Sequence, residues 1–178
     1  MLELKEATLS IGGRTLLNRL SMMAMDGRMT CVTGPAGSGK TLLLRVLMGF
    51  MPLDDGLVSV DGELITPLSA AVFRRHMAYV PQVTAVEPSS WVPPTDDMES
   101  IFSPVPLPVA TAQAVSLPVV TVSDKPIVLA DDPAVALLSR LRALADEGRT
   151  VVVASRREEY LSVSDKIINI TDHDTIIH

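Results

Sequence analysis

The stretch that decides the fold is Gly34–Thr41, which reads GPAGSGKT. It follows the pattern G-x-x-x-x-G-K-[ST], and the four fixed positions are Gly34, Gly39, Lys40 and Thr41. A polyphosphate needs a concave ring of backbone N–H donors, and glycines let the backbone bend tightly without a side chain in the way. The sequence therefore predicts a phosphate-binding loop at this point of the chain.

The loop and the residues after it supply the groups that a nucleotide needs. Lys40 adds a positive charge for the β- and γ-phosphates, and the Thr41 hydroxyl is suited to Mg²⁺. The N-terminal N–H groups and the dipole of a following helix favour an anion. The residues expected to contact the nucleotide are Gly34, Pro35, Ala36, Gly37, Ser38, Gly39, Lys40, Thr41 and Leu42.

Both flanks of the loop agree with this prediction. Met29–Thr33 is a short apolar run typical of a buried strand, and Thr41–Phe50 has leucines and a valine at helical spacing. Strand, glycine-rich loop and helix is the order that the motif requires. The alternative is a Gly/Ser-rich surface turn with a chance Lys-Thr, which does not explain the two flanks.

Composition limits the class of protein. The chain has 178 residues, 47% of them hydrophobic, a mean hydropathy of +0.32 and a net charge of −6. These values predict one domain with a good core and argue against a general nucleic-acid binder. Cys31 is the single cysteine, lies in the expected strand and is expected to be a core residue of a protein from a reducing compartment.

The remaining elements alternate between strands and helices, except in the middle of the chain. Strands are expected at 2–8, 15–25, 29–33, 57–60, 63–66, 77–80, 127–130, 150–154 and 166–170, and an edge hairpin at 171–178. Helices are expected at 41–50, 69–75 (with Ser69 as N-cap), 134–147 and 157–162. This order predicts an α/β fold of the P-loop NTPase type, with a mostly parallel sheet flanked by helices and an antiparallel β edge.

Residues 83–124 differ in character from the rest of the chain. No Lys or Arg lies between Arg75 and Lys125, and eight of the 13 prolines fall between Pro81 and Pro118. Only 95–102 has the pattern of a helix. We therefore expect one domain over 1–178 with an atypical, Pro-rich insertion at 83–124.

The sequence resembles the nucleotide-binding subunit of ATP-binding-cassette (ABC) transporters. In the first half the resemblance is carried by residues 9–49, by DDGLVSVDG and by FRRHMAYVPQ. In the second half it is carried by PIVLADDP and by GRTVVVASRREEYLSVSDKIINI. The resemblance spans 1–82 and 125–178, and it implies an ABC-type core that binds ATP with Mg²⁺.

The resemblance assigns roles to two residues outside the loop. Gln82 corresponds to the Q-loop glutamine, which reaches Mg²⁺ in the family, although a solvated polar loop residue is the alternative. Asp131 corresponds to the Walker B aspartate and would hold Mg²⁺ through water, although it could instead cap the next helix, as Asp132 could. The expected metal ligands are thus Thr41, Gln82 and Asp131.

Several positions depart from the family pattern. Asp132 stands where the family has the glutamate that polarises the attacking water, so Asp132 and Lys40 are the candidate catalytic residues. Arg156 replaces the switch histidine and is either a phosphate contact or a solvated surface charge. Leu138 replaces the dimer-interface aspartate, and Ile11 replaces the aromatic residue that stacks on adenine.

The middle of the chain lacks the signature loop of the family. The nearest register to LSGGQ is LPVAT at 107–111, without the glycines, so the helical subdomain is expected to be reduced or absent. Trp91 in the same segment is either an anchor for a partner or cover for a local core.

These features give a first function hypothesis and two alternatives. The first is an ATP-binding protein of ABC type with weak or no autonomous hydrolysis, serving as a subunit of a transporter or related complex. The second is an active ATPase completed by the signature loop of a partner. A remote third is a P-loop kinase of small molecules, which would need arginines in its lid.

The same features predict the partners and the location. The expected partners are a nucleotide and either a membrane permease or a second cassette subunit, with no nucleic acid and a weak or absent homodimer. The first ten residues lack the pattern of a signal peptide and no stretch has the pattern of a membrane span. We therefore expect a cytoplasmic protein, peripheral at the inner face of a membrane if its partners hold it there.

Overall fold

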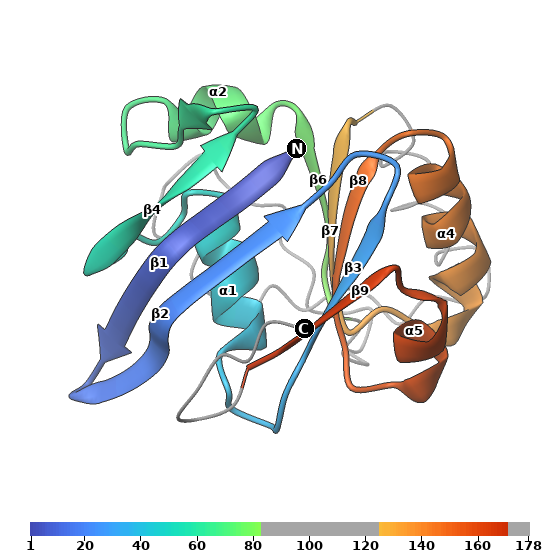
Figure 1. Cartoon of the computed structure of the whole chain (residues 1–178), viewed down its shortest axis with the longest axis horizontal. Coiled ribbons are helices and arrows are strands. Elements are labelled where there is room, and N and C mark those ends of the chain that lie inside the picture. Colours follow the sequence, from blue (N-terminus) through green and yellow to red (C-terminus); the bar gives the residue numbers. More distant parts are fainter. Residues whose placement is uncertain (83–124, 171–178) are drawn as a thin grey trace, which may run out of the picture.

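Two β-sheets with helix α1 (Lys40–Leu47) between them form the frame of the chain, as Figure 1 shows. The fold is that of a computed structural model, and it is described for residues 1–82 and 125–170. One core cluster joins α1 to the antiparallel sheet and to one face of the parallel sheet. The second cluster lies on the other face of the parallel sheet, under α4 (Leu138–Asp146) and α5 (Glu158–Val163).

In the described part of the chain, the antiparallel sheet has four strands in the order β2-β1-β4-β5. Their bounds are β1 (Leu2–Ile11), β2 (Arg14–Ala24), β4 (Asp55–Val60) and β5 (Glu63–Leu64). The alternation that predicted the first strand is seen at its start, because Leu2 and Leu4 are buried on the face toward α1. Register shifts after Leu4 then bring Ala7 and Leu9 to the same face. The antiparallel strands thus form a sheet of their own beside the parallel one.

Within residues 1–82 and 125–170, the parallel sheet has five strands in the order β6-β7-β8-β3-β9. Their bounds are β3 (Met29–Thr33), β6 (Met77–Val80), β7 (Ile127–Asp131), β8 (Thr150–Ala154) and β9 (Lys166–Asn169). Val32, Leu129 and Val152 pack toward α1, while their neighbours in sequence pack toward α4. Both faces are therefore covered, as expected for continuous apolar strands.

Cys31 is confirmed as a core residue of this sheet. Its side chain is fully buried on the face toward α4. Burial raises the pKa of the thiol to about 11, so Cys31 stays protonated at neutral pH and is not a reactive thiolate.

The helices follow the predicted positions with three local differences. Helix α1 ends at Leu47, before the predicted end at Phe50. The predicted helix 134–147 is divided into a 3₁₀ turn, η3 (Val135–Leu137), and α4, so that Leu137 is buried and Val135 is exposed. Helix α2 (Ala70–Arg74) begins after Ser69, but the Ser69 hydroxyl accepts the N–H of Thr66 and does not cap the helix.

The P-loop α/β fold with a mostly parallel sheet is therefore confirmed. The predicted helix at 95–102, the hairpin at 171–178 and the insertion at 83–124 lie outside the described residues. Within 1–82 and 125–170, each helix is too short or too polar to cross a bilayer.

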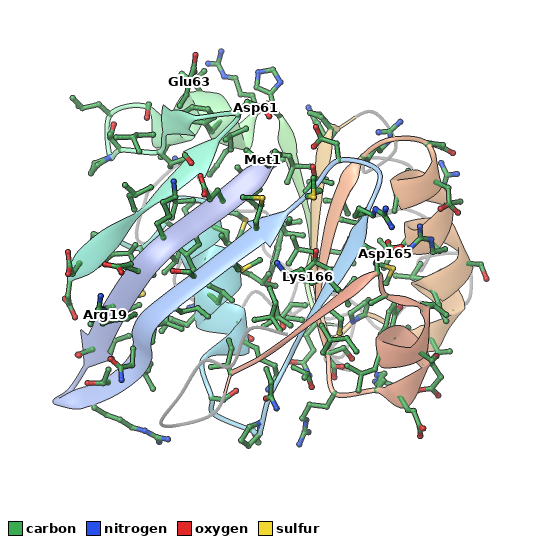
Figure 2. All side chains as sticks on the ribbon, in the orientation of Figure 1. Met1, Arg19, Asp61, Glu63, Asp165 and Lys166 are labelled. Carbon is green, nitrogen blue, oxygen red and sulfur yellow. The ribbon has the colours of Figure 1, made fainter. Side chains whose placement is uncertain are left out.

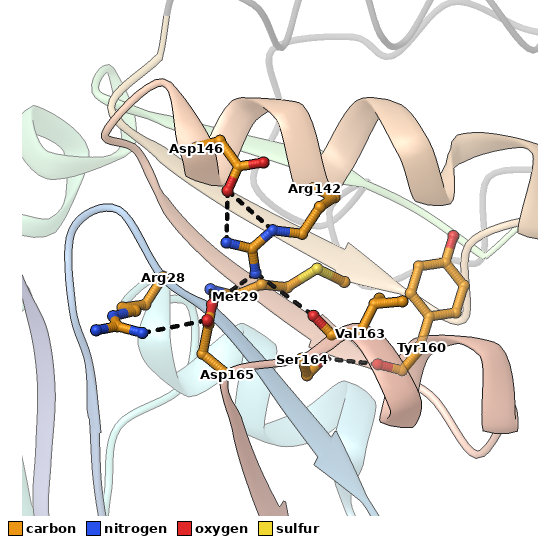
Figure 3. A network of polar contacts seen from close by, with 8 residues as sticks. All are labelled: Arg28, Met29, Arg142, Asp146, Tyr160, Val163, Ser164 and Asp165. Carbon is orange, nitrogen blue, oxygen red and sulfur yellow. Dashed lines mark hydrogen bonds and ion pairs between the residues drawn. The ribbon is translucent and has the colours of Figure 1, made fainter.

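A charged network ties the start of β3 to α4 and to the turn before β9 (Figure 3). Asp165 Oδ2 accepts hydrogen bonds from Arg142 Nη1 at 2.6 Å and from the backbone N–H of Met29 at 2.8 Å, and Oδ1 accepts from Arg28 at 3.2 Å. Arg142 also donates from Nε and Nη2 to Asp146 Oδ1, at 3.0 and 2.6 Å. Since Arg142 and Asp165 are about three-quarters buried (26% and 22% exposed), this pair is more than a surface contact.

The network should make stability depend on pH. Burial raises the pKa of Asp165, but hydrogen bonds from Arg142 and Met29 outweigh it and leave the pKa below its ordinary value. A lowered carboxyl pKa stabilises the fold above pH ~4, and this contribution is lost as the pH falls through the folded pKa. Arg142→Met should therefore lower the free energy of unfolding at pH 7 by about 2 kcal/mol, with a smaller difference from wild type at pH 3.

Urea unfolding of both proteins at the two pH values measures this effect. Arg140→Met on the same helix is the matched control, because Arg140 pairs with Glu147 at 3.5 Å while both side chains are more than 40% exposed. Such a pair contributes less than about 0.5 kcal/mol. Equal losses for the two variants, or a loss that does not change with pH, would contradict the prediction.

Candidate functional site

The order of the parallel strands brings the candidate residues to one edge of the sheet. Parallel strands end at the same edge, where sheets of this kind bind ligands. The phosphate loop follows β3, Asp131 and Asp132 end β7, and Gln82 follows β6. In Figure 1 this edge is the lower one, where the chain leaves β3 and turns up into α1.

The loop owes its shape to its glycines. Gly39, with φ +90°, immediately precedes α1, and Gly37 has φ +77°, so both have backbones in the left-handed region that side chains disfavour. A methyl group on Gly34 would overlap the carbonyl oxygen of Ile170 and lie 2.7 Å from Ser38 Oγ. The first position of the loop therefore accepts glycine without a clash, and any larger residue would force Ile170 or Ser38 to move.

Lys40 and Ser38 provide polar groups inside the loop. Lys40 Nζ donates to the carbonyl oxygens of Gly34 and Pro35, each at 2.7 Å. Its pKa is lowered, first by burial and then by the nearby Arg156 guanidinium. Ser38 Oγ is buried and has no hydrogen-bond partner among the described residues, so the loop has an unsatisfied polar atom and a cation that are suited to a phosphate ligand.

Asp131 is the last residue of β7 and is 5% exposed. Burial raises the pKa of its carboxyl group, while hydrogen bonds from the Thr41 and Tyr79 hydroxyls oppose the rise. Tyr79 donates to Oδ2 at 3.3 Å. In the described part of the chain Asp131 has hydroxyl donors but no ion pair, and a buried carboxylate in this state is suited to a metal cation.

The donor set matches the ligand preference of Mg²⁺. Thr41 and Asp131 are brought together, and Gln82 lies exposed at the end of the neighbouring strand. Hydroxyl, carboxylate and amide oxygens are the hard ligands that Mg²⁺ takes, usually with several waters retained. The residues present thus fit the metal, and the assignment of Thr41, Gln82 and Asp131 as its ligands stays a prediction.

Asp132 has partners that the sequence reasoning did not identify. Its φ is +37°, and its backbone N–H donates to the carbonyl oxygen of Ala154 at 2.7 Å. Its Oδ1 accepts a hydrogen bond from Ser155 Oγ at 2.9 Å and contacts Arg157 Nε at 3.3 Å. The pairing of β7 with β8 aligns Asp131 with Ala154, and this register was the signal that could have placed Ser155 beside Asp132.

The other departures from the family pattern have different surroundings. Arg156 is exposed and close enough to Lys40 to affect its pKa. Ile11 is 45% exposed at the end of β1, and Leu138 packs partly buried against the cluster under α4. The 107–111 segment and Trp91 lie outside the described residues.

A cavity of about 620 Å³ lies at the opposite end of the molecule. It is lined by Met1, Asp26, Val60, Asp61, Glu63, Ser69, Val72, Phe73, His76, Pro126, Ile127 and Gly148. Figure 2 shows the labelled Met1, Asp61 and Glu63 at the upper edge, far from the phosphate loop at the lower edge. We place the candidate site by its donor groups and not by this cavity, because the cavity holds none of them.

Comparison with known proteins connects this site to a family. The family model described as "ABC transporter" matches residues 17–108, just over half of the chain. The Fe(3+) ions import ATP-binding protein FbpC 2 of Pectobacterium atrosepticum is 38% identical over 90 residues, which are 49% of this chain and 26% of that protein. The spermidine/putrescine import ATP-binding protein PotA of Pasteurella multocida is 36% identical over 88 residues, which are 49% of this chain and 23% of that protein. The match thus spans about a quarter of the length of these curated relatives.

Solved structures share the fold at low sequence identity. The ATP binding subunit of an ABC transporter has a TM-score of 0.75 and 15% identity, covering 99% of this chain and 90% of that one. The ATP-binding cassette MJ0796 bound to ADP and Pi has a TM-score of 0.68 and 18% identity, covering 99% and 98%. At these identities the likeness bears on the fold alone.

Proposed function

The chain belongs to the ABC transporter family, whose ATPase domains bind ATP with Mg²⁺, and we propose that it is a nucleotide-binding subunit with weak or no hydrolysis of its own. The observation that carries this proposal is the meeting of Lys40, Thr41 and Asp131 at one edge of the parallel sheet. A surface turn that binds no ligand would have no need of the buried Asp131 carboxylate beside the Thr41 hydroxyl.

Each residue of the site has a defined task in this proposal. The backbone of residues 34–42 surrounds the phosphates, and Lys40 exchanges its two carbonyl partners for phosphate oxygens. Thr41, Gln82 and Asp131 would hold the metal through their oxygen atoms. When bound, Mg²⁺ supplies positive charge that stabilises the phosphate oxygens.

The proposal of weak hydrolysis is supported by the side chain of Asp132 and its contacts. Its side chain is one methylene shorter than the glutamate of the resembling family, and ångström-scale misplacement of a catalytic group can cost about 10²-fold in rate. Its Oδ1 is moreover already engaged by Ser155 and Arg157. A carboxylate held in this way is a poor acceptor for the proton of an attacking water.

A role as a subunit is supported by the relatives, which are import ATP-binding proteins for Fe(3+) ions and for spermidine or putrescine. We propose that the partner is a membrane permease or a second cassette subunit, which would hold this chain at the cytoplasmic face of the membrane. We also propose that 1–178 acts as a single nucleotide-binding domain, with 83–124 in place of the helical and signature subdomain.

Calorimetric titration and steady-state phosphate release test the proposal. We expect the isolated chain to bind both Mg·ATP and Mg·ADP while releasing phosphate at a rate close to background. Folded protein that binds neither nucleotide would overturn the proposal. Turnover well above background by the isolated chain would contradict weak hydrolysis, and turnover that needs a second cassette subunit would favour the ATPase completed by a partner.

A further inference from the structure

The carboxylate of Asp132 is held by two side chains from the segment after β8. Ser155 Oγ donates to Oδ1 at 2.9 Å, and Arg157 Nε lies 3.3 Å from the same oxygen. The Ser155 hydroxyl in turn accepts the backbone N–H of Arg157 at 3.2 Å. Asp132, Ser155 and Arg157 thus each contact the other two, and we call these three residues the Asp132 clamp.

The backbone fixes the clamp to the strand that leads into the phosphate loop. The N–H of Asp132 donates to the carbonyl oxygen of Ala154, and the N–H of Ser155 donates to that of Val32 at 3.0 Å. Ser155 is fully buried, while the side chains of Asp132 and Arg157 are 34% and 45% exposed. The clamp thus has a rigid buried base and a charged pair that reaches solvent at the carboxyl edge.

The ion pair between Asp132 and Arg157 lies among charges that would also act on a bound phosphate. Asp131, Asp132 and Arg156 all act electrostatically on the Lys40 ammonium, so these groups share one small region. A triphosphate brings more negative charge into this region than a diphosphate does, so an unpaired Asp132 would repel ATP more strongly than ADP. The Arg157 guanidinium offsets the charge of Asp132.

We propose that Arg157 is a positioning residue that, together with Ser155, holds Asp132 and neutralises it, and that this pairing lets the site accept the third phosphate of ATP. The inference rests on the proposed function, because it concerns the same nucleotide site. It predicts that Arg157 matters for Mg·ATP and much less for Mg·ADP. A role in folding alone would affect the two nucleotides equally.

A double-mutant cycle on nucleotide affinity tests the inference. Arg157→Gln should weaken Mg·ATP binding about five- to tenfold and Mg·ADP binding less than about twofold. Asp132→Asn should bind Mg·ATP at least as tightly as wild type, and the double variant should return to within about twofold of Asp132→Asn. Arg157→Lys keeps the charge and should retain most of the affinity for ATP.

Two controls keep the outcomes distinct. Arg140→Gln removes an arginine of α4 that forms a solvent-exposed pair with Glu147 at 3.5 Å, and it should change neither affinity. Equal losses for ATP and ADP, or additive effects of Arg157→Gln and Asp132→Asn, would overturn the inference while leaving the proposed function in place. Wild-type protein that binds no nucleotide would overturn both. If Arg157→Gln does not fold, Arg157→Lys takes its place, and a loss of about fivefold or more in the affinity for both nucleotides would overturn the inference.

Discussion

Lys40→Ala is expected to weaken Mg·ATP binding by roughly 30- to 100-fold, the largest change in affinity that we predict for a single side chain. The ammonium group donates to the Gly34 and Pro35 carbonyl oxygens at 2.7 Å in the structure, so it already lies over the loop. A hydrogen bond from a charged group contributes about 1.5–3 kcal/mol, and each 1.4 kcal/mol is a factor of about ten in affinity. Calorimetric titration of the folded variant measures the loss.

Lys166→Ala is the matched control for this prediction. Lys166 begins β9 and donates to the Met23 carbonyl oxygen at 3.5 Å. It starts its strand, while the phosphate loop follows the end of the neighbouring strand β3, so it should not affect the nucleotide. Unchanged Mg·ATP affinity in Lys40→Ala, or a comparable loss in Lys166→Ala, would show that the nucleotide does not bind at this loop.

Most of the fold could be predicted because its strands and helices have strong local patterns. Thr150–Ala154 and Met29–Thr33 are continuous apolar runs, and both are buried strands with the predicted bounds. The alternation at Leu2 and Leu4 likewise gave a strand with one buried face. What could not be predicted was strand order, because the pairing of β7 with β8 and of β8 with β3 is set by contacts distant in sequence.

The candidate site could be predicted only in part, for a similar reason. The loop 34–42 is continuous in sequence and has a motif, so its residues could be named directly. Tyr79, Ser155 and Arg157 have no motif of their own, and their contacts with Asp131 and Asp132 arise from neighbouring strand ends. Sequence spacing carries no information about such contacts until the strand register is known.

The glycines of the loop give the second prediction, which concerns both folding and binding. A Cβ on Gly34 would overlap the Ile170 carbonyl oxygen and lie 2.7 Å from Ser38 Oγ, whereas a Cβ on Gly37 would have no atom within 4 Å. Gly34→Ala should therefore lower the free energy of unfolding by about 3–4 kcal/mol, since overpacking adds to an unfavourable backbone. Gly37→Ala keeps only the cost of its φ of +77°, about 1 kcal/mol.

The two alanine variants also separate the effect of a steric clash in the loop on nucleotide binding from the effect of backbone strain. Gly34→Ala has to displace Ser38, whose buried hydroxyl has no hydrogen-bond partner within 1–82 and 125–170. Its folded fraction should therefore bind Mg·ATP far more weakly than Gly37→Ala does. Urea unfolding gives the stabilities, and titration at a temperature where both variants are folded gives the affinities. If Gly34→Ala were as stable as Gly37→Ala and bound nucleotide equally well, the close contact of the loop with Ile170 would not be what shapes the phosphate site.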